Sequence, residues 1–203
     1  MLIDSKDYSS DKLYFLMTQI IIPRPIAWVL SDNGNGNYNL APYSFFNAIT
    51  SNPPIVMISA GWKDETIKKD TWRNIEERNH FVIHIPSADS AKDVVASSEM
   101  LAHGESEIVK NNLKLVKESS WTLPRLESSK VSLYCTKYAI YEIGQDPQAL
   151  ILGEIKGMWI DDQLISMDGH KLKIDAKALN PLARLGGSEY SLIGEKFTIQ
   201  RPK

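Results

Sequence analysis

Lys69 and Thr71 stand where a helix is expected to begin, in the segment KKDTWRNI at residues 68–75. The first backbone N–H groups of a helix have no partner within the helix, and the helix dipole places positive partial charge there. Such a start binds anions, and a nearby ammonium group and hydroxyl add a charge and a hydrogen bond. The segment therefore suits one phosphate group, although a capped surface helix with two solvated lysines explains the same residues.

A second cluster combines polar and aromatic residues at unusual density. It begins with PRPIAW at residues 23–28, crosses a turn rich in glycine and asparagine, and continues with NLAPYSFFN at residues 39–47. Read singly, its aromatic residues fit a protein core, Asn39 fits a turn and Arg24 fits the solvent. Their joint occurrence is harder to explain by structural roles alone.

A third cluster, LNPLARLGGSEY, lies at residues 179–190. Gly186 and Gly187 permit a tight turn or a close backbone approach, and Arg184 offers a planar set of donors for a carbonyl or a phosphate. The alternative interpretation is a C-terminal arm that carries a surface arginine.

Other chemistries find little support. His80 and His84 are four residues apart on an expected strand, which separates them by about 13 Å, too far to share a metal ion. The chain has no G-x-S-x-G elbow, no Walker loop and no G-x-G-x-x-G after a strand, since Gly34 and Gly36 lie in a turn without a third glycine. We therefore expect neither a metal site nor a Rossmann nucleotide site.

The elements that must position these residues are mostly strands. Apolar runs predict strands, and the turn at 33–37 predicts a hairpin connection. Helices are expected from Asp70 as N-cap through Arg78, from a Ser90–Asp93 capping box through Met100, and over 105–112. The expected strand segments are 26–30, 38–51, 55–60, 80–85, 134–143 and 150–160. Short strands with few helices favour a barrel, and residues 1–203 are expected to form one domain.

Composition bounds the class of protein. Hydrophobic residues make up 43% and charged residues 24%, as in an ordinary globular protein. A net charge of −2 gives no broad positive field, so nucleic acid is not an expected partner.

Cys135 is the one cysteine in the sequence, and it is expected to be a small residue within a strand. No internal disulfide can therefore form. With no signal peptide or membrane-spanning run apparent, we expect a cytoplasmic protein without a membrane partner.

Taken together, five motifs in order resemble the flavin reductase-like family of FMN-binding split-barrel proteins, which includes flavoredoxins and reductase components of two-component monooxygenases. The likeness runs from about Leu13 to Gly194. The motifs are PRPIAWV, NLAPYSFFN, a Pro-Pro pair before a strand, KDT-x-x-NI, and NPLARLGG followed by Tyr190 and Gly194. Two features depart from the pattern: the turn at 33–37, and His84, which stands where related chains often carry asparagine and whose role stays open.

The resemblance implies a mainly β fold with a few helices, an FMN-binding split β-barrel. It implies FMN as cofactor, with FAD as an alternative, NAD(P)H as co-substrate, and a homodimer in which Arg184 reaches the flavin of the partner subunit. Lys69 and Thr71 would take the phosphate. The implied cofactor-binding residues are Arg24, Pro25, Ile26, Ala27, Trp28, Asn39, Ser44, Phe45, Asn47, Ser59, Lys69, Thr71 and Arg184.

The homodimer also follows from geometry. A small barrel fills its interior with side chains, so a planar cofactor must lie on an outer surface, which a second subunit would cover. Two-fold symmetry then creates two identical half-sites.

The function expected from this resemblance is an oxidoreductase. Flavin would accept hydride from NAD(P)H and pass electrons to an acceptor or to a partner protein such as a monooxygenase, with no catalytic side chain required. An alternative is an FMN-binding electron carrier or sensor without its own NAD(P)H site. A third interpretation is an interaction domain that binds no ligand.

Overall fold

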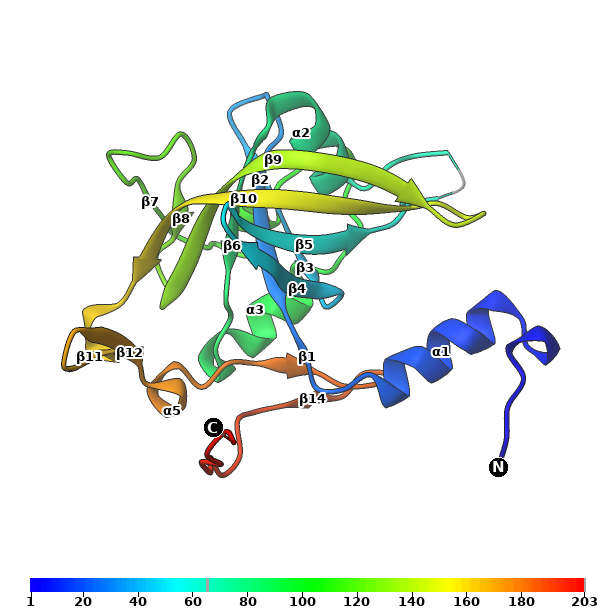
Figure 1. Ribbon diagram of the computed structural model, residues 1–203. Helices are drawn as coiled ribbons and strands as arrows, with labels where there is room; N and C mark the ends of the chain where they lie inside the picture. The colour runs from blue at the N-terminus through cyan, green and yellow to red at the C-terminus, as the bar shows by residue number, and fades with distance from the viewer. Residues whose placement is uncertain (65, 203) are drawn as a thin grey trace.

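The computed structural model describes residues 1–64 and 66–202, and a seven-stranded antiparallel sheet forms its centre (Figure 1). The strand order is β3-β2-β6-β9-β10-β5-β4. The strands are β2 (Ala27–Asp32), β3 (Tyr38–Tyr43), β4 (Phe46–Ser51), β5 (Pro54–Ala60), β6 (His80–His84), β9 (Val131–Ile143) and β10 (Gln148–Ile160).

The connection between β3 and β4 closes this sheet into a barrel. These strands are the two edges of the sheet, yet only Ser44 and Phe45 separate them in the chain. The three Cα–Cα steps from Tyr43 to Phe46 span at most about 11 Å, so the edges must approach each other where the chain crosses. We call this crossing the seam. The Ser59 amide donates to the Phe45 carbonyl at 2.9 Å, which holds the seam against β5.

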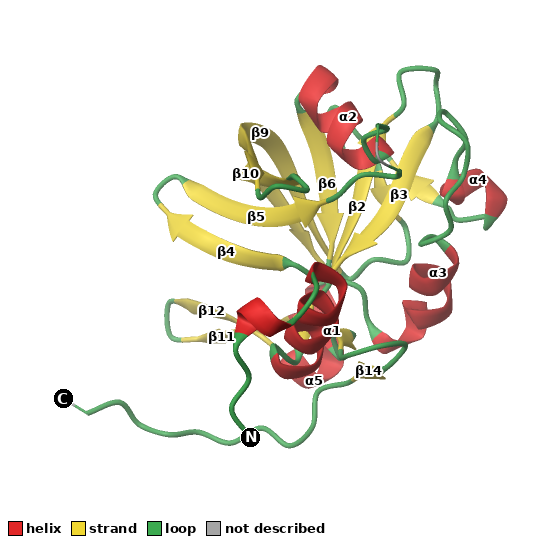
Figure 2. Ribbon diagram, turned by 90° about the vertical axis from the view of Figure 1, so that its right-hand side faces the viewer, coloured by secondary structure: helices red, strands yellow, loops and turns green. Residues whose placement is uncertain are grey.

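Helices and small sheets surround the barrel (Figure 2). The helices are α1 (Ser10–Ile20), α2 (Asp70–Arg78), α3 (Ala91–Ala96), α4 (Glu107–Lys110) and α5 (Ala176–Leu179), with 3-10 turns η1 (Ser5–Asp7), η2 (Ala88–Ser90) and η3 (Asp162–Leu164). Smaller sheets join β1 (Arg24–Pro25), β13 (Ala183–Arg184) and β14 (Tyr190–Ser191); β7 (Leu115–Val116) and β8 (Arg125–Leu126); and β11 (Ile165–Asp168) and β12 (Lys171–Ile174).

The core lies on both faces of β2. Ala27 and Val29 belong to one buried cluster, which α2 completes with Trp72 and Ile75. Trp28 and Leu30 point the other way into a second cluster. Successive residues of a strand face opposite sides, so a strand buried on both sides reads as an unbroken apolar run.

The expected strands and the antiparallel pair β9–β10 are confirmed, and so is the mainly β fold. Cys135 is buried in β9, as expected. The hairpin at 33–37 is also confirmed: the Asn33 amide donates to the Asn37 carbonyl at 3.0 Å, and Gly34 and Gly36 adopt positive φ.

The helices α2 and α3 begin or end at other residues than expected. The N-cap of α2 is Lys69 rather than Asp70, whose side chain forms ion pairs instead. Helix α3 ends at Ala96, short of the expected Met100. The Ser90 hydroxyl does not cap this helix, because it donates to the carbonyl of Ser87 instead. The segment 38–51 is two strands, because the chain crosses the seam at residues 44–45. Helix α1 was not expected.

No helix among the described residues is long and apolar enough to span a membrane.

Candidate functional site

Three adjoining hollows follow the seam of the barrel. The inner hollow, about 120 Å³, lies between Tyr43 and the loop at 97–101. The central hollow, about 320 Å³, lies at Ser44 and Phe45, and the arm hollow, about 150 Å³, reaches Arg184. The inner and central hollows share Tyr43 and Lys69, and the central and arm hollows share Ser44. Of these three hollows, only the central one reaches the roughly 300 Å³ at which pockets for small organic ligands begin, so it is the candidate cofactor site.

The hollows bring together seven of the thirteen expected site residues. Ser44, Phe45, Ser59 and Lys69 line the central hollow, Asn39 lines the inner hollow, and Arg24 and Arg184 line the arm hollow. Segments far apart in the sequence, from strand β3 to strand β13, therefore meet along one path.

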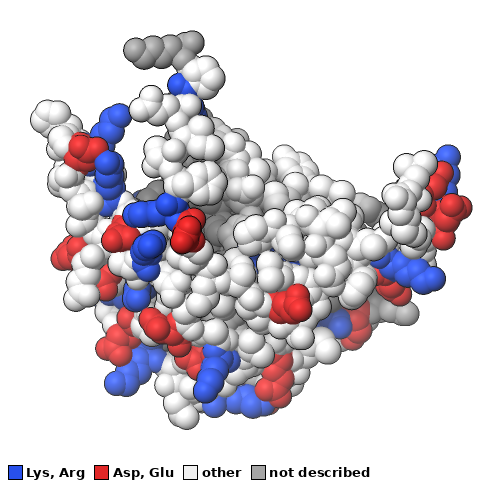
Figure 3. Space-filling view, turned by 90° about the horizontal axis from the view of Figure 1, so that it is seen from below, with Lys and Arg blue, Asp and Glu red and all other residues white. Residues whose placement is uncertain are grey.

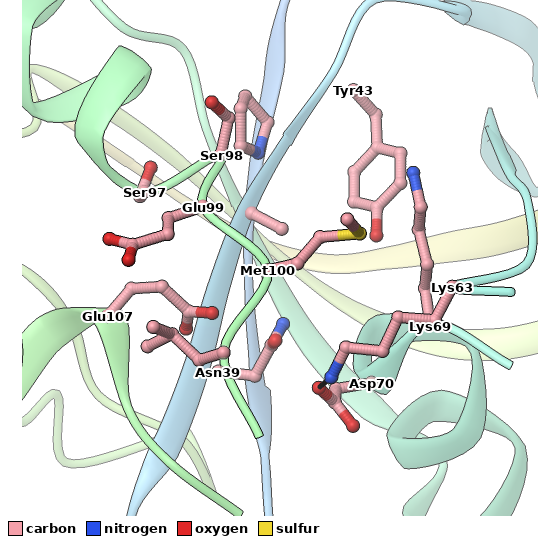
Figure 4. A pocket seen from close by; sticks show the side chains of 13 residues that line it. Asn39, Tyr43, Lys63, Lys69, Asp70, Ser97, Ser98, Glu99, Met100 and Glu107 are labelled. Carbon is pink, nitrogen blue, oxygen red and sulfur yellow. Dashed lines mark hydrogen bonds and ion pairs between the residues drawn. The ribbon is translucent and has the colours of Figure 1, made fainter. Parts of the chain in front are cut away.

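Among the described residues, Lys69 is the lysine that lines the central hollow. Its half-buried ammonium lies 5.9 Å from the centre of the Tyr43 ring, and burial lowers its pKa. Among the described residues, no carboxylate forms an ion pair with it. Figure 4 shows Lys69 rising beside Tyr43, while Lys63 reaches toward Asp70. A bound anion would give this ammonium the partner that it lacks, at the start of α2.

The inner hollow carries carboxylates. Asp70 accepts from Lys63 Nζ at 2.8 Å, and its other oxygen lies 2.6 Å from His103 Nδ1. Glu107 accepts from the Leu40 amide at 2.9 Å, and burial raises the pKa of its carboxyl group. These acids disfavour an anion here, so a phosphate is better placed on the central side of Lys69.

Thr71 does not line any of these hollows. Its side chain is fully buried, and its hydroxyl oxygen accepts from Asn39 Nδ2 at 2.8 Å. Asn39 also contacts Ser31, to which Asn74 donates at 3.1 Å. This buried network joins the helix start to the hairpin, so the position of Thr71 suits holding Asn39 in place.

Arg24 is an anchor within the protein. Its buried guanidinium donates to the carbonyls of Thr18 at 2.6 Å, Ile21 at 2.8 Å and Leu185 at 2.7 Å. A longer bond of 3.3 Å reaches the Ser44 hydroxyl. Arg24 therefore ties the end of α1 and the C-terminal segment to the seam, and most of its donors are already used.

Five of the expected site residues, in and next to strands β1, β2 and β4, lie outside the hollows. Ile26, Ala27 and Trp28 have buried side chains, and Trp28 Nε1 donates to the Ser97 hydroxyl at 2.8 Å. Pro25 and Asn47 are exposed, and Asn47 accepts from the amide of Ala48. None of these five expected site residues lines the three hollows.

Arg184 lies opposite Arg24 in the pairing of β1 with β13. Its guanidinium stacks over the Tyr190 ring at 4.6 Å and donates to the Gly187 carbonyl. These contacts hold it beside the arm hollow of its own chain.

Six lining residues of the central hollow were not expected from the sequence. Pro42 and Tyr43 belong to the second motif, whereas Tyr14, Gly61, Trp62 and Gln148 lie outside the motifs. Tyr14 lies on α1, before the first motif, and contributes to both the central and the arm hollow. Its ring centre is 6.1 Å from that of Phe45. An apolar pattern around Tyr14, Phe15 and Met17 was the available signal, but it does not reveal that α1 reaches the seam.

His84 has a structural role. Its Nδ1 lies 3.0 Å from the Trp28 carbonyl, and its Nε2 accepts from the Leu126 amide at 3.0 Å. Nδ1 therefore carries the proton, and burial lowers the pKa of His84 to about 4. In the described part of the chain, no three histidine, cysteine or acidic residues group as a metal site.

A model of the flavin reductase-like domain matches residues 17–174, more than half of the chain. The chain belongs to the flavin reductase-like family. A relative from Halalkalibacterium halodurans is 34% identical over 206 residues, covering 100% of this chain and 97% of its own.

Solved structures of the family agree with this assignment. Nitrilotriacetate monooxygenase component B from Bacillus cereus is 29% identical, with a TM-score of 0.91 and 98% of each chain covered. The 2-nitrobenzoate 2-nitroreductase of Pseudomonas fluorescens is also 29% identical, with a TM-score of 0.88, covering 100% of this chain and 96% of its own. A protein with a split-barrel domain from Shewanella frigidimarina, 17% identical with a TM-score of 0.83 and 100% of both chains covered, shows the fold. The expected split barrel is thus confirmed.

Proposed function

We propose that this protein is an FMN-binding oxidoreductase that accepts hydride from NAD(P)H onto the flavin and passes electrons to an acceptor. The observation that carries the proposal is the half-buried ammonium of Lys69 at one end of the central hollow, with which no described carboxylate forms an ion pair. FMN combines a planar ring system with one terminal phosphate. The hollow supplies the Lys69 cation for that phosphate and the aromatic side chain of Phe45, at the seam, for the rings.

In this arrangement the phosphate lies at Lys69, and the ring system lies along Ser44 and Phe45 with Ser59 beside it. Bound flavin supplies the hydride-accepting chemistry, and the protein's contribution is to bind and orient it. The hydroxyls of Ser44 and Ser59 can donate to the ring carbonyls or the ribityl chain. The positive charge of Lys69 holds the phosphate at the other end of the flavin.

Anaerobic assays test the proposal. The protein loaded with FMN is mixed with NADH or NADPH, and the loss of flavin absorbance is followed. We expect bleaching with at least one of the two. Bound FMN that neither nucleotide reduces, but that a reduced partner protein does, would favour the electron carrier instead.

The acceptor that we propose is a partner monooxygenase. The support is the likeness to a monooxygenase component B, at 29% identity over nearly the whole chain. Oxygen consumption coupled to NAD(P)H oxidation, with and without a candidate oxygenase, measures this transfer.

We further propose a homodimer. Helix α1 extends away from the barrel in Figure 1, and its exposed apolar residues include Phe15, Met17 and Ile20. Ile21 and Ile22, which follow it, are also exposed. Figure 3 shows that most charges on the underside lie around its margin and that its centre is largely uncharged. Such a surface fits burial against a second copy.

A further inference from the structure

Tyr14 occupies an unusual place relative to the family domain. It precedes residue 17, where the matched domain begins, yet its side chain lines both the central and the arm hollow. Tyr14 is 60% exposed as a residue. It meets the Phe45 ring at a centroid distance of 6.1 Å and an angle of 48°. The two rings form an aromatic corner at the mouth of the central hollow.

The position of Tyr14 is set by the anchored end of α1. Thr18 is the one buried residue of this helix, which the structure describes in full. Residues four apart share a helix face, so Tyr14 lies on the side that Thr18 turns toward the body. Arg24 holds the Thr18 and Ile21 carbonyls at that end and also bonds Ser44 in the seam. Tyr14 is thereby held beside the seam.

We propose that Tyr14 is a positioning residue whose ring stacks against the flavin ring system in the central hollow. The inference rests on the proposed function, because it requires a flavin there. Aromatic rings gain affinity by offset stacking, and a side chain with few rotatable bonds loses little entropy in doing so. The Tyr14 ring has an exposed surface next to the hollow, whereas the Phe45 ring is already partly covered.

The test compares FMN with riboflavin, which has the same rings but no phosphate. Replacing Tyr14 by alanine is expected to raise the Kd of both flavins by a similar factor, about tenfold. Tyr14→Phe keeps the ring and is expected to restore both affinities. This pattern differs from loss of a phosphate contact, which would weaken FMN alone. Fluorescence titration of the full-length protein measures all four values.

Lys12→Ala is the matched control, because Lys12 is exposed on the same helix, lines neither the central nor the arm hollow, and is not one of the apolar residues proposed for the dimer interface. It is expected to leave both Kd values unchanged. If Lys12→Ala weakens binding as much as Tyr14→Ala, the effect comes from displacement of α1 and the stacking inference is wrong. Light scattering on each variant shows whether its oligomeric state has changed.

Two further outcomes separate this inference from the proposed function. If the wild-type protein binds FMN and Tyr14→Ala binds both flavins equally well, Tyr14 does not stack, but the proposed function stands. If the wild-type protein binds neither flavin, both proposals fail.

Discussion

At the scale of single residues, Lys69 and Lys68 differ in what surrounds them. Lys68 is paired with Glu76 at 2.8 Å and lies over the Trp72 ring, whereas Lys69 faces the central hollow without an ion-pair partner among the described residues. Only Lys69 is therefore available to a phosphate.

Replacement of Lys69 by alanine should weaken FMN binding selectively. A hydrogen bond to a charged group contributes roughly 1.5 to 3 kcal/mol, so the Kd for FMN should rise about ten- to a hundredfold. Riboflavin lacks the phosphate, and its Kd should stay nearly constant. Calorimetric titration of both ligands measures this. Lys68→Ala is the neighbouring control, and an equal loss in that variant would contradict a specific role for Lys69.

Thr71→Ala should act differently from the simple loss of a phosphate contact. If Thr71 took the phosphate, as the family resemblance implies, this change would weaken FMN binding and spare riboflavin. Because the Thr71 hydroxyl is buried and accepts from Asn39, its removal leaves a buried amide donor unpaired, at a cost of about 1 to 3 kcal/mol in stability. We therefore expect a lower unfolding midpoint in urea and similar weakening of both flavins. A selective loss of FMN affinity at unchanged stability would show that Thr71 binds the phosphate directly.

His84 should make the protein sensitive to acid. Its pKa is about 4 in the folded state and 6.5 when unperturbed, so the unfolded chain binds the proton more readily. The stability supplied by neutral His84 is present above about pH 6.5 and is lost as the pH falls toward 4. Between pH 7 and pH 5 the loss should be about 2 kcal/mol. Urea unfolding at the two pH values measures it.

The control for this experiment is the exposed residue His170. His84→Asn should reduce the acid-induced loss of stability, whereas His170→Asn should leave it as in the wild type. An undiminished pH dependence in His84→Asn would assign the effect to other groups.

At the scale of elements, β10 needs a glycine where it passes Phe81. A Cβ atom on Gly153 would lie 2.3 Å from Phe81 Cζ, and the Phe81 ring is buried with 1% of its surface exposed. The pairing of β10 with β9 shifts register at this point, between Leu152 and Gly153. The close approach of the ring to the strand explains why a side chain does not fit there.

Gly153→Ala should therefore destabilise the barrel by about 1 to 3 kcal/mol, the usual cost of overpacking a core. Gly194→Ala is the control, because its Cβ would meet no atom within 4 Å. Thermal unfolding of both variants tests this, and equal unfolding temperatures would show that β10 can move away from Phe81.

At the scale of the whole molecule, the exposed apolar surface of α1 favours association. Ile20 is 73% exposed at the end of this helix, next to Ile21 and Ile22. Burial of one large aliphatic side chain contributes about 1.5 to 3 kcal/mol, so several of them in one interface can stabilise a dimer.

Light scattering at micromolar concentration should accordingly report about twice the chain mass of 22.9 kDa. Ile20→Glu should shift the protein toward the monomer, because it would bury an unpaired charge at the interface. Ile49→Glu is the control, because it makes the same change at an exposed residue of β4, outside the proposed interface. It should leave the dimer intact. A strictly monomeric wild-type protein that still binds FMN tightly would refute the dimer.

Local sequence patterns were sufficient to predict most strands, the hairpin at 33–37 and the family. Strands such as β2 and β6 are continuous apolar runs, which local patterning reveals, and the glycines of the hairpin satisfy a local backbone requirement. The family follows from ordered motifs, and its match covers residues 17–174. These features depend on residues that are close in the chain.

Which motif residues can meet a ligand follows from the tertiary structure. Arg24 lines the arm hollow, but its guanidinium is occupied by carbonyls of α1 and of the C-terminal segment. Thr71 is buried and accepts a hydrogen bond from Asn39. Tyr14 lies outside the motifs and still reaches the seam. The direction of a side chain depends on contacts with distant segments, and no local pattern records those contacts. Closure of the barrel at Ser44 and Phe45 brings these segments together and therefore determines which side chains can meet a ligand.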